Sequence, residues 1–129
     1  MKEVSHPLIT IDYQSRAPIY EQIVEKFQML ILKGVLSPGS RMPSVRSLAV
    51  DLSINPNTIQ KAFAVLEQEG YIFPVKGRGN FVSESASLFE KKKESCLGEL
   101  KKLLSYAAEL GIPKEDCTEI LSQVYEEVS

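Results

Sequence analysis

Forty residues in the middle of the chain, 43–82, combine helix signals and turn signals in an order that few folds share. The segment 43–49 (PSVRSLA) predicts the start of a helix, 53–56 (SINP) interrupts it, and 57–63 (NTIQKAF) continues as a second helix. The segment 69–82 then places two short apolar runs on either side of the turn KGRG. Two helices, a tight turn and a hairpin in this order predict a winged helix-turn-helix, which places its second helix in the major groove of DNA.

Residues with special backbone preferences set the boundaries of these elements. Ser44 and Asn55 are predicted to cap the N-termini of the two helices with their side-chain oxygens. Pro56 suits the first helical position, because the N–H that proline lacks has no intrahelical partner there. Residues 71–75 and 80–83 are the two predicted strands of the hairpin, which we call the wing.

The N-terminal part predicts one further helix and a short extended segment. Apolar residues recur at helical spacing between Pro18, which suits a first turn, and Lys33-Gly34, which suits a helix end. Residues 8–12 alternate briefly and are expected to form a short strand or an extended arm. His6 precedes them and is expected to lie in a mobile arm. The DNA-binding winged domain is therefore expected to occupy residues 1–83.

The region from residue 84 onward changes in composition and predicts two helices. Leucines recur at helical spacing up to Leu110, Gly111-Ile112-Pro113 interrupts the pattern, and a last helix follows. So short a break predicts an antiparallel helical hairpin, residues 84–129. The expected fold class is mostly α with a small β wing: an N-terminal winged helix-turn-helix plus a C-terminal two-helix hairpin.

The apolar face of this hairpin is too wide to be buried within the hairpin alone. We expect it to pack against a second copy of the chain, which makes it a dimerisation element. The alternative is that the hairpin folds back on its own winged domain. The residues expected at the dimer interface are Phe89, Leu97, Leu100, Leu104, Leu121, Val124 and Tyr125.

Charge is distributed unevenly between these two regions. The 129-residue chain has a formal net charge of −2, which by itself argues weakly against binding nucleic acid. Residues 1–83, however, hold nine Lys and Arg against seven Asp and Glu, whereas residues 84–129 hold six against ten. The basic excess therefore coincides with the winged domain, where it can meet phosphates. The chain shows no apolar run of membrane-spanning length and no signal-peptide pattern, so a cytoplasmic protein is expected.

Residues that usually carry catalysis or bind metals are sparse. His6 is the only histidine, and no nucleophile–base set, metal-ligand cluster or phosphate loop is visible, so we expect no enzyme, cofactor or metal site. Cys96 and Cys117 lack metal-binding spacing; small core residues are their expected role and a redox switch is the alternative. Their offset of roughly 10 Å along the hairpin disfavours an intrachain disulfide, and a disulfide across the dimer is left open.

Five blocks of sequence together resemble the GntR family of bacterial transcription regulators. They are PIYEQI (18–23), GVLSPG (34–39), PSVRSLA (43–49), NPNTIQKA (55–62) and EGYI (69–72). The NPNT segment and the short tail look most like the YtrA-type branch of that family. The resemblance implies a homodimeric winged-helix protein that binds double-stranded DNA and represses operons. Because only 46 residues follow Ser83, any small-molecule effector would have to sit between subunits or between hairpin and winged domain.

The second helix of the helix-turn-helix offers four polar side chains for reading DNA: Asn57, Thr58, Gln60 and Lys61. Asn and Gln pair with adenine, Thr meets the thymine methyl group, and Lys reaches phosphate or guanine. Many family members carry an Arg near the start of this helix and another one turn later. Here Pro56 or Asn57 and Gln60 stand at those positions, which leaves base preference open. For Asn57 a plain first-turn polar role is the alternative.

The other predicted DNA contacts lie before this helix and on the wing. The resemblance assigns a DNA contact to Arg46, with a surface salt bridge to Asp51 or a neighbour as the alternative. Ser44 either donates to a phosphate as well as capping or only caps. A winged module that binds a protein is the second hypothesis for the whole chain, but it would more often expose an apolar patch. The full set of these contacts is Arg41, Ser44, Arg46, Lys76, Gly77 and Arg78.

Overall fold

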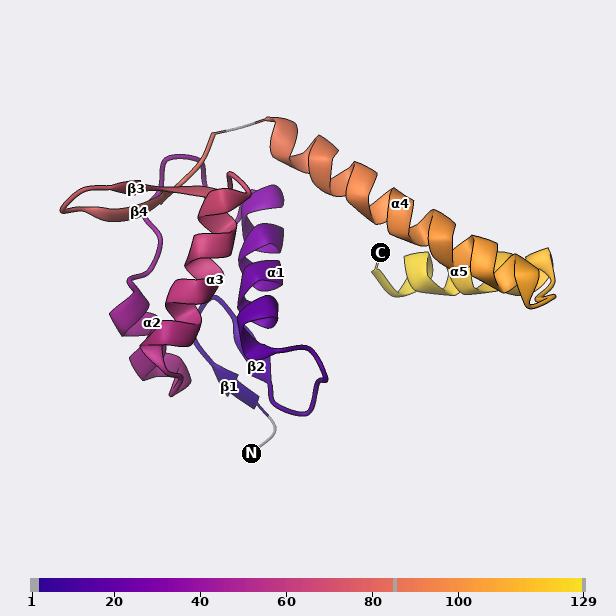
Figure 1. Cartoon of the computed structure of the whole chain (residues 1–129), viewed down its shortest axis with the longest axis horizontal. Helices are drawn as coiled ribbons and strands as arrows, with labels where there is room; N and C mark the ends of the chain where they lie inside the picture. Colours follow the sequence, from indigo (N-terminus) through magenta and orange to yellow (C-terminus); the bar gives the residue numbers. More distant parts are fainter. Residues whose placement is uncertain (1–2, 85, 129) are drawn as a thin grey trace. The chain divides into compact units, whose positions relative to one another are not determined.

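The computed structural model describes residues 3–84 and 86–128, and it divides into two compact units between Leu88 and Phe89. The first unit contains, in chain order, β1 (Glu3–Ser5), β2 (Thr10–Asp12), α1 (Ile19–Leu32), α2 (Val45–Leu52), α3 (Pro56–Gln68), β3 (Ile72–Val75) and β4 (Gly79–Val82) (Figure 1). The second unit contains α5 (Lys114–Val128) and all but the first residues of α4 (Ser87–Glu109). These elements confirm the predicted fold class, mostly helical with a small β wing.

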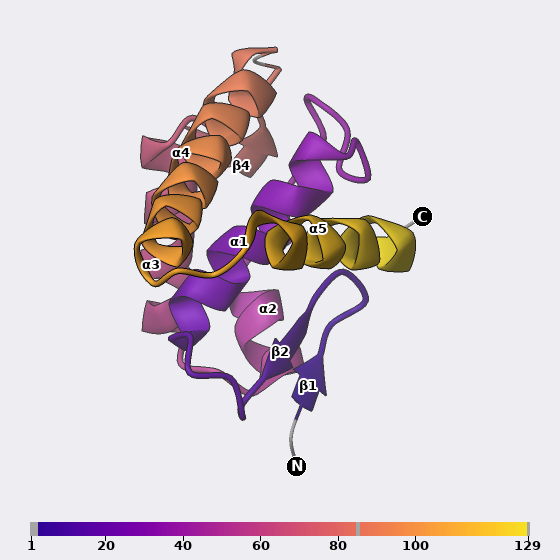
Figure 2. The ribbon, with the colours of Figure 1, turned by 90° about the vertical axis from the view of Figure 1, so that its right-hand side faces the viewer.

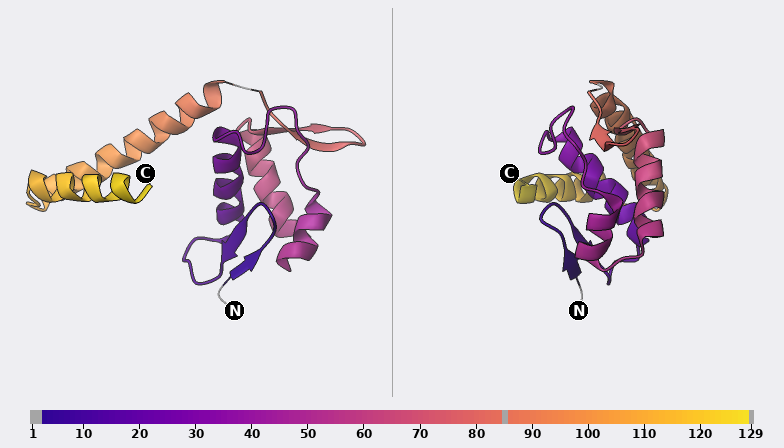
Figure 3. Two further views of the ribbon diagram at one scale, coloured as in Figure 1. Left: turned by 180° about the vertical axis from the view of Figure 1, so that it is seen from behind. Right: turned by 90° about the vertical axis from the view of Figure 1, so that its left-hand side faces the viewer.

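Three helices enclose the core of the first unit. α1 and α3 lie side by side, with their N-terminal ends at the same end of the unit (Figures 1 and 3). The rings of Phe27 on α1 and Phe63 on α3 meet edge to face, with centroids 5.9 Å apart, a favourable geometry for aromatic pairs. The largest fully buried side chains are Phe27, Ile11, Ile23, Leu48, Leu52, Ile59, Leu66, Ile72 and Val82.

Both predicted N-caps of the helix-turn-helix are confirmed. The Ser44 hydroxyl oxygen accepts a hydrogen bond of 3.0 Å from the backbone N–H three residues later, and the Asn55 side-chain oxygen accepts one of 2.9 Å from the N–H of Asn57. Between the two helices Ser53 adopts a left-handed conformation with φ 54°, which costs energy for a residue with a Cβ. The caps and this turn fix where α3 begins relative to α2.

The wing is a two-stranded antiparallel hairpin, with Ile72 opposite Val82, and the loop that precedes α2 is hydrogen-bonded to it. The N–H of Gly39 donates to the carbonyl oxygen of Val82, and the N–H of Met42 donates to that of Asn80, both at 2.8 Å. In return the N–H of Val82 donates to the carbonyl oxygen of Ser40 at 2.8 Å. The wing and the approach to α2 are therefore joined through the backbone.

The N-terminal segment forms a second hairpin, in which β1 pairs antiparallel with β2. A short strand within residues 8–12 was predicted, but its partner was not, because three residues at the start of a chain carry too little alternation to be recognised. His6 is also not in the mobile arm that we expected. Its Nε2 lies 3.3 Å from a carboxylate oxygen of Asp51 on α2, and its Nδ1 accepts a hydrogen bond from the N–H of Leu8.

The second unit contains the two helices that the sequence predicted, joined by a turn over Leu110–Pro113. The two helices diverge from this turn and make little contact along their length, unlike a closely packed antiparallel pair (Figures 1 and 2). In the described range 89–128 no side chain is buried, and only Ala107 and Cys117 are half-buried. Cys96 is exposed, so neither cysteine belongs to the core of a single chain. Among the described residues no helix combines the length and apolar character that crossing a membrane requires.

Candidate nucleic-acid interface

The first two turns of α3 expose the polar face that the sequence predicted. Asn57, Gln60 and Lys61 are exposed and Thr58 is half-buried, while Ile59 on the opposite face is fully buried. The amide-and-lysine face of α3 is therefore open to solvent. Asn57 and Gln60 each present a donor and an acceptor, which is the combination that adenine requires in the major groove.

Arg46 lies on the first turn of α2 with an exposed side chain. Arg46 does not form the alternative salt bridge with Asp51, whose carboxylate lies against His6 instead. Within the described part of the chain Arg46 takes part in no ion pair. Its guanidinium, a planar group with five N–H donors, is therefore available to a phosphate or a guanine edge.

The wing tip carries two exposed cations on either side of a glycine turn. Lys76, Gly77 and Arg78 are all exposed, and the N–H of Arg78 donates to the carbonyl oxygen of Val75 at 2.9 Å, which closes the turn. Figure 1 shows α2 and the wing on the side of α3 that lies away from α1. A thin cationic hairpin of this kind suits the minor groove or its phosphates.

Arg41 lies across the backbone of the wing at Gly79. A Cβ built at Gly79 would stand 3.4 Å from Nε of Arg41, and Gly79 has a φ of 99°, which other residues rarely adopt. Glycine is therefore required at this position for the backbone conformation, and it also leaves room for the guanidinium. Arg41 itself is exposed, so its predicted place at the DNA surface agrees with its accessibility.

Two contacts at this surface were not predicted from the sequence. Tyr20 on α1 is half-buried, and the ammonium of Lys61 lies over its ring, 3.9 Å from the ring centroid. Phe81 is half-buried and stacks on the exposed Phe73 across the wing, with centroids 6.1 Å apart. Both contacts join residues that are not neighbours along one helix face, so no sequence periodicity indicates them.

The residues predicted to form a dimer interface are all exposed in the single chain, by between 45% and 70%. Phe89, Cys96, Leu100, Leu103 and Ala107 follow one another along α4 at steps of seven, four, three and four residues, and Leu110 comes three residues later, just past the end of the helix. This spacing matches the seam along which helices pack in bundles and coiled coils. Leu121, Val124 and Tyr125 form a comparable exposed stripe on α5.

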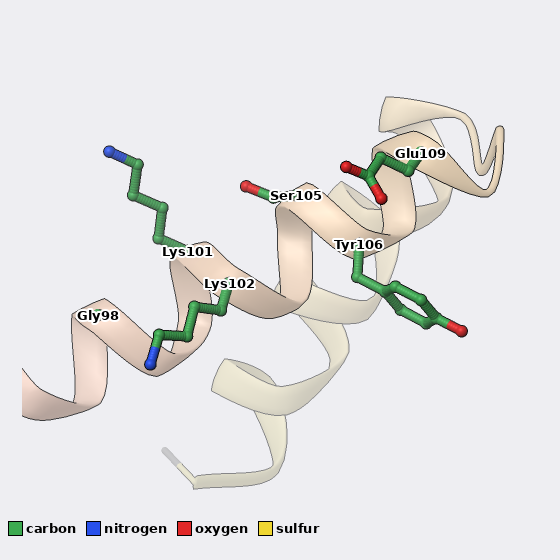
Figure 4. A pocket seen from close by; sticks show the side chains of 6 residues that line it. All are labelled: Gly98, Lys101, Lys102, Ser105, Tyr106 and Glu109. Atoms are coloured by element: carbon green, nitrogen blue, oxygen red, sulfur yellow. The ribbon is translucent and has the colours of Figure 1, made fainter.

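A surface hollow with a volume of about 470 Å³ lies on α4. All six residues that line it come from this one helix, and Figure 4 shows the side chains of Lys101, Lys102 and Tyr106 pointing in different directions. They do not converge on a common point, so the hollow offers no arrangement for holding a ligand. No group of three or more potential metal ligands occurs among the residues that the structure describes.

A family model and a curated relative both match this chain to bacterial regulatory proteins. Residues 19–82 match the family model described as bacterial regulatory proteins, gntR family. The chain is 41% identical to the HTH-type transcriptional repressor YtrA of Bacillus subtilis (strain 168) over 123 residues, which cover 94% of this chain and 95% of the relative.

Solved structures extend these matches to the three-dimensional fold. A transcriptional antiterminator from Listeria monocytogenes EGD-e superimposes with a TM-score of 0.74 at 32% identity, covering 96% of this chain and 94% of its own. The DNA-binding domain of AraR in complex with operator ORE1 covers 57% of this chain and 89% of its own at 27% identity, with a TM-score of 0.51.

Proposed function

The chain belongs to the GntR family of bacterial regulatory proteins, and we propose that it represses transcription as a homodimer bound to a pseudo-palindromic operator. Like its relatives, it is a DNA-binding transcriptional regulator and not an enzyme. In this proposal residues 1–83 bind DNA and residues 84–129 hold two copies together.

The main support for the proposal is that α2, α3 and the wing, which pack around one hydrophobic core, all expose polar or cationic side chains. Arg46 on α2, the Asn57–Lys61 face of α3 and the cations of the wing are all accessible. They divide into the two kinds of group that operator recognition requires, cations for phosphates and amides for base edges. The DNA-binding domain of AraR, which has a related fold and was solved with its operator, supports DNA binding by this unit.

The homodimer is supported by the exposed apolar stripes of α4 and α5. Leucine side chains at this spacing and this degree of exposure are typical of an interface rather than of a free surface. A two-fold dimer presents two copies of α3, so the operator is expected to contain two related half-sites. Repression is supported by the activity that the name of the Bacillus subtilis relative gives it.

Selection of bound fragments from random double-stranded DNA tests the proposal. We expect an enriched inverted repeat, bound by two chains per duplex and increasingly weakly as salt concentration rises, because several phosphate contacts release counterions. Matched RNA duplexes serve as the control, since one structural relative is described as an antiterminator. Equal binding to RNA and DNA, or a flat salt response, would contradict the proposal.

Replacing Arg46 by Ala sharpens this test. We expect Arg46→Ala to weaken operator binding by about tenfold to a hundredfold, because it removes a charged donor from the interface, and to leave thermal unfolding unchanged. Lys26→Ala is the charge-matched control, because Lys26 is exposed on α1 outside the predicted interface. Operator affinity of Arg46→Ala equal to that of Lys26→Ala, measured by mobility shift at one salt concentration, would remove Arg46 from the site.

A further inference from the structure

Tyr20, which lies outside the predicted interface, contacts Lys61, which lies inside it. The ammonium of Lys61 on α3 lies 3.9 Å from the centroid of the Tyr20 ring, which belongs to the first turn of α1. Lys61 is the sole basic residue among the thirteen of α3. The only cation that this helix brings to DNA is therefore held by a neighbouring helix.

We propose that Tyr20 is a positioning residue that holds the Lys61 ammonium as a phosphate contact, so that α3 reads bases through its amide side chains alone. The inference rests on the proposed function, because it concerns the operator complex. Lys61 lies one helical turn after Asn57 and so shares its face. Its side chain, however, extends toward α1 instead of along that face.

Tyr20 is suited to this task by its packing. Its side chain is half-buried and contacts the hydrophobic core, so the ring is a fixed platform. Its hydroxyl donates a hydrogen bond to a carboxylate oxygen of Glu21 at 3.4 Å. The ring face is therefore the part of Tyr20 that acts on Lys61, and the hydroxyl has a separate partner.

The contact restrains Lys61 without using up its hydrogen-bonding capacity. A free lysine side chain populates many rotamers, and an ammonium over an aromatic face is attracted by the negative potential of the ring. The ammonium has three N–H donors, and those directed away from the ring remain available for phosphate oxygens. Phosphate contacts orient a protein on the duplex without reading its sequence. Lys61 is thus expected to add affinity equally to all half-site sequences.

The contact is tested first in the free protein by NMR. Protons of the Lys61 Cε group should show an upfield ring-current shift in the wild type and in Tyr20→Phe, which keeps the aromatic ring. The shift should disappear in Tyr20→Leu, which keeps apolar volume but has no ring. An equal Lys61 spectrum in Tyr20→Leu and wild type would overturn the inference.

Operator binding then tests the role of the contact. We expect Lys61→Ala and Tyr20→Leu each to weaken binding by about threefold to tenfold, the double variant to lose no more than the worse single variant, and Tyr20→Phe to stay within about twofold of wild type. Lys61→Ala should lower the salt slope by about one and weaken binding to all base variants of the half-site by the same factor. Lys26→Ala is the control for a lost lysine outside the interface, and thermal unfolding identifies any variant that fails to fold.

The results of these experiments distinguish a failure of the Tyr20–Lys61 inference from a failure of the proposed operator binding. Additive losses in the double variant would overturn the positioning role of Tyr20, and a change of base preference at one operator position in Lys61→Ala would overturn the phosphate contact. Either result would leave operator binding itself intact. A wild-type protein that selects no DNA sequence would overturn both proposals. In that case the proton shift of Lys61 still reports whether the ring and the ammonium meet in the free protein.

Discussion

The two units of this chain use apolar residues in opposite ways. Among the described residues every buried apolar side chain lies between Ile9 and Leu88, where helices and strands enclose one core. From Phe89 to Val128 apolar residues recur just as regularly, and none is buried. The first unit therefore has its own core, whereas the apolar face of the second needs another surface to cover it.

The energetic scale supports this contrast. Fully burying a Leu or Phe side chain is worth about 1.5–3 kcal/mol relative to exposing it. Leu100, Leu104 and Phe89 are exposed by 45%, 45% and 56%, so much of that stabilisation is not realised in a single chain. A second copy would realise it, and this is why the proposed dimer is coupled to the stability of the tail.

The largest expected effect separates the two units by truncating one phenylalanine in each. Phe27→Ala empties a fully buried site and should lower the free energy of unfolding by about 3–5 kcal/mol at every protein concentration. Phe89→Ala, its matched control on α4, should have a smaller effect that depends on protein concentration. Urea unfolding of both variants at two protein concentrations measures these losses. Equal losses that do not depend on protein concentration would contradict the claim that only the second unit needs a partner.

A charge placed on the apolar stripe of α4 tests the need for a partner directly. Leu100→Asp should weaken dimerisation by about a hundredfold or more, because a carboxylate would be buried without a partner at the interface. Ser105→Asp adds the same charge to the polar face of the helix and is the control. Sedimentation equilibrium measures both, and an unchanged association constant for Leu100→Asp would remove this stripe from the dimer interface.

Removing a helix cap is expected to affect only the winged unit. Asn55→Ala removes the acceptor of the hydrogen bond from the N–H of Asn57 and should cost about 1 kcal/mol of unfolding free energy. Since the cap lies within the first unit, the loss should not vary with protein concentration. Gln68→Ala, an exposed change near the other end of α3, provides the baseline for thermal unfolding. A concentration-dependent loss for Asn55→Ala would show that the units are not independent.

The smallest expected effect appears at alkaline pH. Burial, and then the nearby carboxylate of Glu69, raise the pKa of the Tyr71 phenol above its usual 10.0. Above pH 10 the unfolded chain therefore binds fewer protons at this residue than the native chain. The contribution to stability is complete below pH 10 and is lost as pH rises through the raised pKa. Tyr71→Phe should flatten this alkaline decline in urea unfolding, and an identical decline in the two proteins would assign it to other groups.

Local sequence signals predicted the winged unit well, because its boundaries are set by residues with strong backbone preferences. Ser44, Asn55 and Pro56 stand where α2 and α3 begin, and the turn KGRG stands where the wing reverses. The exposed face of α3 also followed from helical spacing alone. These features depend on neighbours within a few residues, so the sequence contains them directly.

Features that join distant segments were not predictable in the same way. The pairing of β1 with β2, the contact of His6 with Asp51 and the placement of Lys61 over Tyr20 all depend on how the elements pack. The small contact between α4 and α5 was not predicted either. Apolar periodicity shows which face of a helix is to be covered, but it does not show whether the neighbouring helix or another chain covers it.

The backbone hydrogen bonds between residues 39–42 and the wing have a consequence for the proposed interface. They tie the wing to the entry of α2, so these two parts of the surface keep one spacing within a single copy. In the proposed dimer, the spacing between the two copies would then depend on the residues that hold them together, and a crosslink placed there would test whether that spacing governs DNA binding.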